Sequence, residues 1–245
     1  MACSHNSEQM PESKSRISLP FKDPVSGFTH LLGALLSIWG LVVLIRHAAN
    51  YGGARYLLAA AIFGASLILL YSASAIYHLV LAPEKTTMIL RRIDHMMIYV
   101  LIAGTYTPIC LIALQGKWGT GLLIAIWILA FIGILLKLLW FNAPRWLSTL
   151  FYLLMGWLVI IAIFPLARVI PAIGISWLVI GGVLYTLGAI IYATKWPHIS
   201  SRIFGFHEIF HLFVMGGSLS HFWLVFRYVM VNGFLKSPCL SRQKL

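Results

Sequence analysis

Charged residues are scarce in this 245-residue sequence: they make up 10% of the chain, whereas 60% of the residues are hydrophobic. A soluble domain carries about 25% charged and about 45–50% apolar residues. So little charge could not cover the surface of a globular protein of this size, which excludes the soluble classes. Disordered, collagen-like and coiled-coil chains are excluded by the same composition. The composition is that of an integral membrane protein.

Acidic residues are the rarest charged group. Six Asp and Glu stand against 18 Lys and Arg, which gives a formal net charge of +12. In a soluble chain this excess would suggest nucleic acid as a partner. In a membrane chain it is typical of basic loops that face the cytoplasm and its anionic lipids. We therefore expect membrane lipids as partners and no nucleic acid, and the sequence indicates no protein partner.

Cysteine is also rare. Cys3, Cys110 and Cys239 are far apart and form no CxxC pair, so neither a disulfide framework nor a thiolate metal site is expected. No glycine-rich phosphate loop of the dinucleotide or P-loop kind is present. The first 24 residues are polar and lack the apolar stretch of a cleavable signal, so we expect the first spanning helix to act as the insertion signal.

Long apolar runs, in contrast, are abundant. A span needs roughly 20 predominantly apolar residues to cross about 30 Å of hydrocarbon. The predicted fold class is therefore all-α, a polytopic membrane protein with a seven-transmembrane helix bundle over residues 25–231. A polar N-terminal tail (1–24) and a short C-terminal tail (232–245) flank the bundle. The seven predicted spans lie near residues 25–45, 56–81, 94–114, 120–140, 147–166, 170–192 and 206–230.

The connectors between these runs carry the charges and the helix breakers. One connector is predicted from Pro83 to Arg92, before the third span. Residues 147–192 would form a helix about twice as long as a bilayer accommodates, so Pro165, Arg168 and Pro171 are expected to mark a tight turn.

The basic residues divide unevenly between the two sides of the bundle. Ten lie on the side of the N-terminal tail and four in the opposite connectors, although the C-terminal tail adds three to the opposite side. The positive-inside tendency then places the N-terminus in the cytoplasm. We expect a multi-pass protein of the cell inner (plasma) membrane. The ten are Lys14, Arg16, Lys22, Lys85, Arg91, Arg92, Lys137, Arg145, Lys195 and Arg202, and the four are Arg46, Arg55, Lys117 and Arg168.

Polar side chains that are costly in a membrane gather at one depth. Ionisable residues inside a span usually mark function. Odd spans begin and even spans end on the same side, so the polar groups at these ends meet at one level, which is the inner leaflet if the charge count is right. They are Asp23, His30, Ser74, His78, Asp94, His95, His207, Glu208 and His211.

Three of these histidines form a candidate metal site. His207 and His211 are four residues apart, so both imidazoles project from one helix face, the usual separation for two ligands of one Zn²⁺. His78 from the second span would complete a His₃ set, and water would take the fourth position. Ser74 lies one turn before His78 and can donate a hydrogen bond to a ligand or to the water. Fe²⁺, Co²⁺ and Ni²⁺ fit the ligand type as well, and the alternative role for the pair is helix packing.

Asp94 has two compatible interpretations. As a structural residue it caps the start of the third span or pairs with Arg91. As a catalytic residue it accepts the proton of the metal-bound water and orients it. His95 points about 100° away from Asp94 on the helix, and we interpret it as a packing or lipid-interface residue.

The stretch from His207 to His211 also fits H-E-x-x-H, the helix signature of zinc metalloproteases, with Glu208 as general base. His221 is roughly 15 Å further along the helix, so it cannot bind the same ion, and we expect it to bond a neighbouring helix. An intramembrane zinc metalloprotease with another third ligand stays open as an alternative.

With these residues in place, the chain resembles the bacterial hemolysin III family, within the progestin and adipoQ receptor superfamily. The superfamily pattern favours Glu and Asn where this chain has Asp23 and Ser26, which keep hydrogen-bonding ability but have a shorter reach. Beyond positioning His30, the sequence assigns this segment no role. The resemblance is carried by Asp23-Pro-Val-Ser26-Gly-Phe-Thr29-His30, Ser74-Ala-Ile-Tyr-His78, Arg92-Ile-Asp94-His95, His207-Glu-Ile-Phe-His211 and Ser220-His221-Phe.

The resemblance implies seven helices, a cytoplasmic N-terminus, a zinc ion held by His78, His207 and His211, and Asp94 bonding the water. It further implies cytolysis or pore formation, membrane-lipid homeostasis, and zinc-dependent hydrolysis of lipid amides of the ceramidase type. A channel or pore in which zinc is structural is the main alternative, although few charged residues lie at mid-depth in any span.

Overall fold

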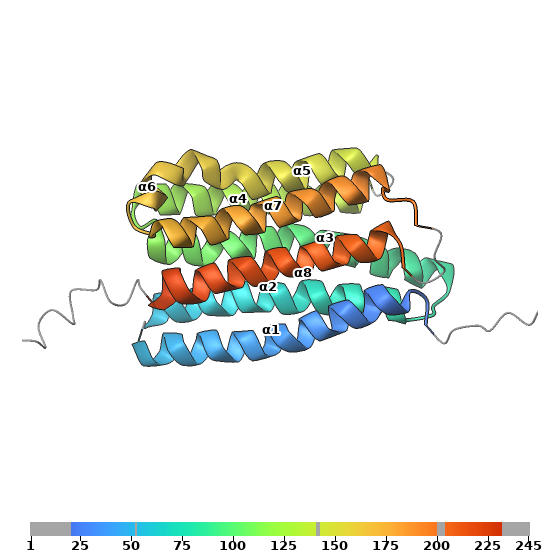
Figure 1. The fold of residues 1–245 in the computed structure, drawn as a ribbon, viewed down its shortest axis with the longest axis horizontal. Coiled ribbons are helices and arrows are strands. Elements are labelled where there is room, and N and C mark those ends of the chain that lie inside the picture. Colours follow the sequence, from blue (N-terminus) through green and yellow to red (C-terminus); the bar gives the residue numbers. More distant parts are fainter. Residues whose placement is uncertain (1–20, 52, 141–142, 200–203, 232–245) are drawn as a thin grey trace, which may run out of the picture.

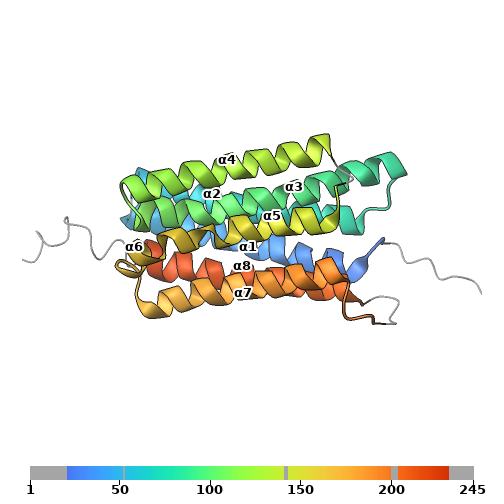
Figure 2. The ribbon, with the colours of Figure 1, turned by 90° about the horizontal axis from the view of Figure 1, so that it is seen from above.

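The protein is a helix bundle in which all the long helices are aligned with one long axis and successive spans run in opposite directions (Figures 1 and 2). The computed structural model describes residues 21–51, 53–140, 143–199 and 204–231, and these contain helices and short connectors but no strand. The predicted tails 1–24 and 232–245 lie outside the described residues, except for 21–24. The all-α prediction is confirmed.

Seven helices are long and apolar enough to cross a membrane, as predicted. Three spans are composite. The π-helical segments η1 and η3 extend α3 and α8, and the fifth span joins α5, the 3₁₀ segment η2 and α6. The elements are α1 (Pro24–Tyr51), α2 (Ala54–Leu79), α3 (Glu84–Pro108), η1 (Ile109–Ala113), α4 (Lys117–Leu139), α5 (Arg145–Trp157), η2 (Leu158–Ala162), α6 (Ile163–Ala167), α7 (Ala172–Thr194), α8 (Phe206–Leu224) and the π-helical η3 (Val225–Val231).

Apolar side chains cover the outside of the bundle as well as its interior. Leu35, Ile128 and Phe164 are exposed, which suits contact with lipid chains, because a helix that is hydrophobic all round is typical of a membrane span. Trp118 and Trp196 are exposed near helix ends, as expected for interfacial aromatic residues. The chain is a multi-pass membrane protein.

The third helix begins ten residues earlier than predicted. It starts at Glu84 and not near residue 94, so most of the predicted Pro83–Arg92 connector is helical. Pro83 precedes the first turn, and the charged residues that follow are good helix formers. The apolar pattern marks where hydrocarbon ends, whereas this helix continues past that point. Capping of the helix by Asp94 is therefore wrong, because Asp94 lies almost three turns inside it.

The turn between the fifth and sixth spans lies close to its predicted position. Residues 168–171 connect α6 to α7, as expected. Pro165 lies inside the short helix α6 and not in the turn itself.

A side chain from α3 supports the break in the fifth span. The Tyr106 hydroxyl lies 2.9 Å and 2.8 Å from the carbonyl oxygens of Met155 and Gly156, to which it donates. It also accepts a hydrogen bond of 2.8 Å from the N–H of Val159. Unpaired backbone groups are costly where water is absent, so Tyr106 replaces bonds that the change from α to 3₁₀ geometry removes.

Tyr106→Phe is expected to lower the free energy of unfolding by about 1–3 kcal/mol, because it leaves buried backbone groups without a partner. Tyr56→Phe is the matched control, since the Tyr56 hydroxyl makes no hydrogen bond to a described residue. Denaturant unfolding of the purified variants in detergent measures the difference. Equal midpoints for the two variants would show that Tyr106 does not support the break.

One end of the bundle collects the starts of α1, α3, α5 and α8 and the ends of α2, α4 and α7 (Figure 1). The predicted alignment of polar residues at one depth follows from this arrangement. At mid-bundle, the His221 ring donates to the Leu178 carbonyl of α7 at 3.1 Å, as expected for a packing residue. Gly181 lies directly against this ring, so a larger residue there would meet it.

Candidate functional site

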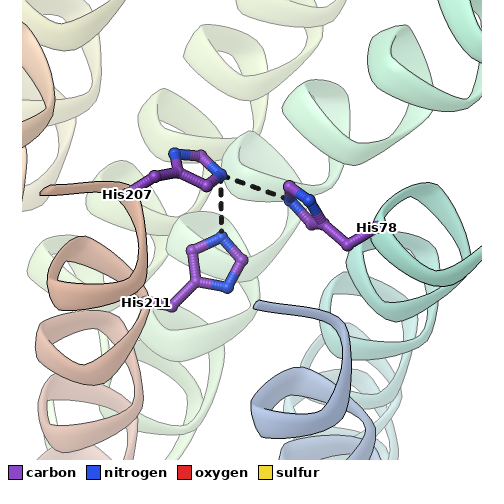
Figure 3. A group of neighbouring side chains, drawn as sticks. All are labelled: His78, His207 and His211. Atoms are coloured by element: carbon purple, nitrogen blue, oxygen red, sulfur yellow. Dashed lines mark hydrogen bonds between the residues drawn. The ribbon is translucent and has the colours of Figure 1, made fainter. Parts of the chain in front are cut away.

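Three histidines converge at the end of the bundle where α2 ends and α8 begins. His78 lies in the last turn of α2, and His207 and His211 lie in the first two turns of α8. The Nε2 atom of His207 lies 3.3 Å from Nε2 of His78 and 3.2 Å from Nε2 of His211 (Figure 3). His78 and His211 are each only 2% exposed. The three predicted ligands are therefore close enough together to hold a metal ion.

The N-terminal end of α1 fixes the position of His78. The Nδ1–H of His78 donates to Asp23 Oδ2 at 3.0 Å, and the Asp23 backbone N–H donates to the His78 carbonyl at 2.8 Å. This bond to the ring holds the pKa of the Asp23 carboxyl below its usual value. With the proton on Nδ1, the Nε2 lone pair of His78 points toward the other two rings. A carboxylate behind a ligating imidazole is the usual arrangement in metal sites.

A second contact ties α1 to α8. The Ser26 hydroxyl donates to Glu208 Oε1 at 2.8 Å, and the Gly205 N–H donates to Oε2 at 2.7 Å. Both carboxylate oxygens are thus engaged in holding the start of α8, which is the reciprocal part of a capping box. These bonds favour a structural role for Glu208 over the general-base role that a metalloprotease requires.

His30 completes the packing around the three histidines. Its ring stacks on that of His211, with centroids 3.7 Å apart and an interplanar angle of 19°, and meets Tyr71 edge-on. His30 is buried. The stacking restricts the orientation of His211, so the α1 segment positions two of the three converging rings.

Sequence reasoning assigned no role to Asp23 and Ser26 and missed their contacts. A signal was available in their spacing, because Asp23, Ser26 and His30 stand at i, i+3 and i+7, on one face of a helix. The partners on α2 and α8 are 55 and 182 residues away in the chain, so only the tertiary structure reveals them.

Ser74 and Asp94 line a cavity beside the three histidines. This cavity has a volume of about 150 Å³ and extends through the bundle interior from His207 and His211 to Tyr106 and His221. Ser74 is buried one turn before His78. The Asp94 carboxylate lies on α3, 3.6 Å from Nδ1 of His95. Both predicted catalytic residues thus face the same cavity as two of the predicted ligands.

His95 packs against its neighbours, as predicted. Its Nδ1–H donates to the Arg91 carbonyl at 2.7 Å, and the Tyr192 hydroxyl donates to Nε2 at 3.3 Å. The His95 carbonyl accepts from the Tyr152 hydroxyl at 3.1 Å. His95 therefore connects α3 to α5 and α7 and forms part of the cavity wall.

Comparison with known families gives a match over most of the chain. The family described as "Haemolysin-III related" matches residues 20–222. The chain belongs to this family. All the residues of the site lie within the matched region, and the resemblance noted in the sequence is confirmed.

Individual relatives agree with this assignment. The chain is 45% identical over 210 residues to the Hemolysin-3 homolog of Bacillus subtilis (strain 168), a match that covers 86% of this chain and 95% of the relative. It is 41% identical over 222 residues to Hemolysin-3 of Bacillus cereus, with 90% and 98% covered. A distant relative in the adipoQ receptor family is the monocyte to macrophage differentiation factor of Homo sapiens, 27% identical over 180 residues and 69% of each chain.

Proposed function

We propose that this hemolysin III-type protein binds one zinc ion at His78, His207 and His211 and hydrolyses the amide bond of membrane lipids beside it. The convergence of three Nε2 atoms beside a cavity inside a membrane bundle, which two of the three histidines line, is the observation that carries the proposal. We assign the site end of the bundle to the inner leaflet of the plasma membrane, because most of the Lys and Arg residues in the described part of the chain lie at that end.

The donor set fits zinc. Zinc bound to imidazole has N–Zn distances of about 2.0–2.1 Å and tetrahedral geometry, which requires ligand nitrogens roughly 3.3 Å apart. The two separations from His207 Nε2, of 3.2 Å and 3.3 Å, match this spacing, and all three ligand atoms lie within 4.8 Å of one another. Asp23 supplies the hydrogen-bonded outer partner of His78, and His30 restrains His211 by stacking, whereas Nδ1 of His211 is buried without a hydrogen-bond partner among the described residues.

Zinc with three imidazole ligands supplies a water of pKa near 7 and polarises a carbonyl group. The chain itself supplies the acid–base groups. The Asp94 carboxylate accepts the proton of the attacking water and returns it to the amide nitrogen as the C–N bond breaks, so that the fatty acid and the free amine are released. The Ser74 hydroxyl donates a hydrogen bond to a polar atom of the substrate. Asp23 keeps the His78 proton on Nδ1 throughout, so the direction of the Nε2 lone pair does not change.

The cavity supplies the place for an acyl chain. Its volume of about 150 Å³ is some ten times what one water needs by the same measure, roughly 10–15 Å³. Side chains without polar groups form much of its wall. An alkyl chain that fills this space is stabilised by van der Waals contacts with the surrounding helices. Its amide end then lies beside Asp94 and Ser74. The apolar members are Leu70, Ile98, Leu101, Ile102, Leu153, Ala189 and Val214.

Zinc removal tests this proposal. Purified protein in lipid nanodiscs is expected to release fatty acid from a fluorescent ceramide-like amide, to lose this activity when a chelator strips the zinc, and to regain it with Zn²⁺. Mg²⁺ is not expected to restore activity, because it prefers oxygen ligands. Hydrolysis that continues in protein shown to be free of zinc would contradict the proposal. Ion flux through liposomes that persists without zinc, together with absent hydrolysis, would instead support the channel with structural zinc.

A further inference from the structure

A second cluster of charged residues lies close to the cavity but outside the candidate metal site. Lys137 is in the last turn of α4, and its side chain points into the bundle, since the residue is only 5% exposed. The sequence places it among the basic residues that flank a connector, where an exposed side chain is expected. An ammonium group buried in a spanning helix is costly and usually has a functional partner.

Within the part of the chain that the structure describes, the Lys137 ammonium has no carboxylate within ion-pair distance and no hydrogen-bond acceptor. Lys137 lines a small cavity of about 40 Å³, which we call the Lys137 pocket. The charged and hydroxyl groups that define the pocket are Arg91, Lys137, Arg145, Ser148, Tyr152 and Tyr192.

The Lys137 pocket is rich in cationic hydrogen-bond donors. Three cationic side chains line it, and Arg145 lies over the Tyr192 ring, 5.6 Å from its centroid, at the exposed rim. The Tyr152 hydroxyl is engaged with the backbone of His95. The Lys137 ammonium on α4 and the Arg145 guanidinium on α5, together with the Ser148 hydroxyl about one turn after Arg145, therefore supply donors to the pocket. An oxyanion is the ligand that such a set binds best.

The size and place of the pocket narrow the choice of anion. Its volume is about three times the roughly 10–15 Å³ that one water needs, which suits a single phosphate group and not a nucleotide. It lies at the same end of the bundle as the three histidines, where α4 ends and α5 begins. This end is the level of lipid headgroups, and anionic headgroups are attracted to basic residues there.

We propose that the Lys137 pocket binds the phosphate group of an anionic ligand, with the Lys137 ammonium as its buried partner. A phospholipid headgroup and free phosphate are the two sources of this chemistry. The site is independent of the proposed zinc site, although His95, Tyr152 and Tyr192 line both cavities. A phospholipid bound there would lie alongside the cavity that we assign to the acyl chain.

Titration of the purified full-length protein in detergent tests the proposal, with the thermal unfolding midpoint as readout. The probes are dioctanoyl phosphatidylglycerol and inorganic phosphate, added separately. We expect a saturable rise of the midpoint with at least one probe, and an apparent affinity about tenfold or more weaker in Lys137→Met, because a hydrogen bond to a charged group is lost. Lys137→Arg is expected to keep most of the affinity.

Lys117→Met is the matched control, because Lys117 lies on the same helix at the opposite end of the bundle and is exposed. It is expected to bind as the parent protein does. Arg145→Gln, at the rim, is expected to weaken binding too and serves if Lys137→Met does not fold. A response to phosphatidylglycerol alone assigns the headgroup, and a response to both probes assigns phosphate itself. No saturable response in the parent protein, or unchanged affinity in the pocket variants, overturns the proposal.

Discussion

Replacing His78 with alanine is expected to abolish stable zinc binding. The substitution removes one of three converging nitrogens and leaves only the pair on α8. Loss of an outer partner alone costs about 10–100-fold in metal affinity, so loss of a ligand is expected to weaken binding by more than about 100-fold. Metal analysis after dialysis should then give close to zero zinc for each chain.

The control for this prediction is His198→Ala. His198 is exposed in the connector after α7 and contacts none of the three rings, so this variant removes an imidazole without affecting the site. Its zinc content is expected to equal that of the parent protein. Full zinc retention in a folded His78→Ala variant would show that the ligand set is wrong.

Asp94→Asn is expected to lower the turnover of a ceramide-like amide by about 10²–10⁴-fold, the range for loss of a general base. The amide side chain has nearly the same shape as the carboxylate but cannot accept the proton. Zinc content is expected to stay the same, because Asp94 is not among the three converging ligands. Initial rates of fatty-acid release, with zinc measured on the same samples, test both parts.

Glu84→Gln is the matched control for Asp94→Asn, since it removes an exposed carboxylate from the same helix. Its turnover is expected to stay at the level of the parent protein. If Asp94→Asn hydrolyses the substrate as fast as Glu84→Gln does, Asp94 is not the base. If neither the parent protein nor any variant releases fatty acid at a full complement of zinc, the metal is structural.

The sequence alone was sufficient to predict which histidines meet. Alternation of span direction places the end of the second span and the start of the seventh at one depth, and four-residue spacing puts His207 and His211 on one face. These are consequences of helix geometry and membrane thickness, which do not depend on the detailed packing. The convergence of the three rings in Figure 3 follows from them.

The start of the third helix could not be read in the same way. Hydropathy reports where residues leave the hydrocarbon, and α3 continues for about ten residues beyond that point, from Ile93 back to Glu84. Charged residues such as Arg91 and Arg92 fit a helix as well as a loop. The same limit applies to Lys137. Its charge suggests a position beside a connector, but its side chain is buried inside the bundle.

The support around the histidines also required the structure. Ser26 was noted only as a departure from a family pattern, yet it donates to Glu208 across the interface of α1 and α8. A one-dimensional pattern does not reveal which polar residues of neighbouring helices face each other. The short side chains at positions 23 and 26 reach their partners because α1 lies close to α2 and α8 at this end.

The most direct test of the central claim is the zinc content and zinc coordination of the parent protein, purified under zinc-replete conditions. Mass spectrometry of the metal should give about one zinc for each chain, and X-ray absorption should show three imidazole nitrogens at about 2.0–2.1 Å. Protein that contains no zinc after this preparation, or zinc without histidine ligands, would contradict the proposed site.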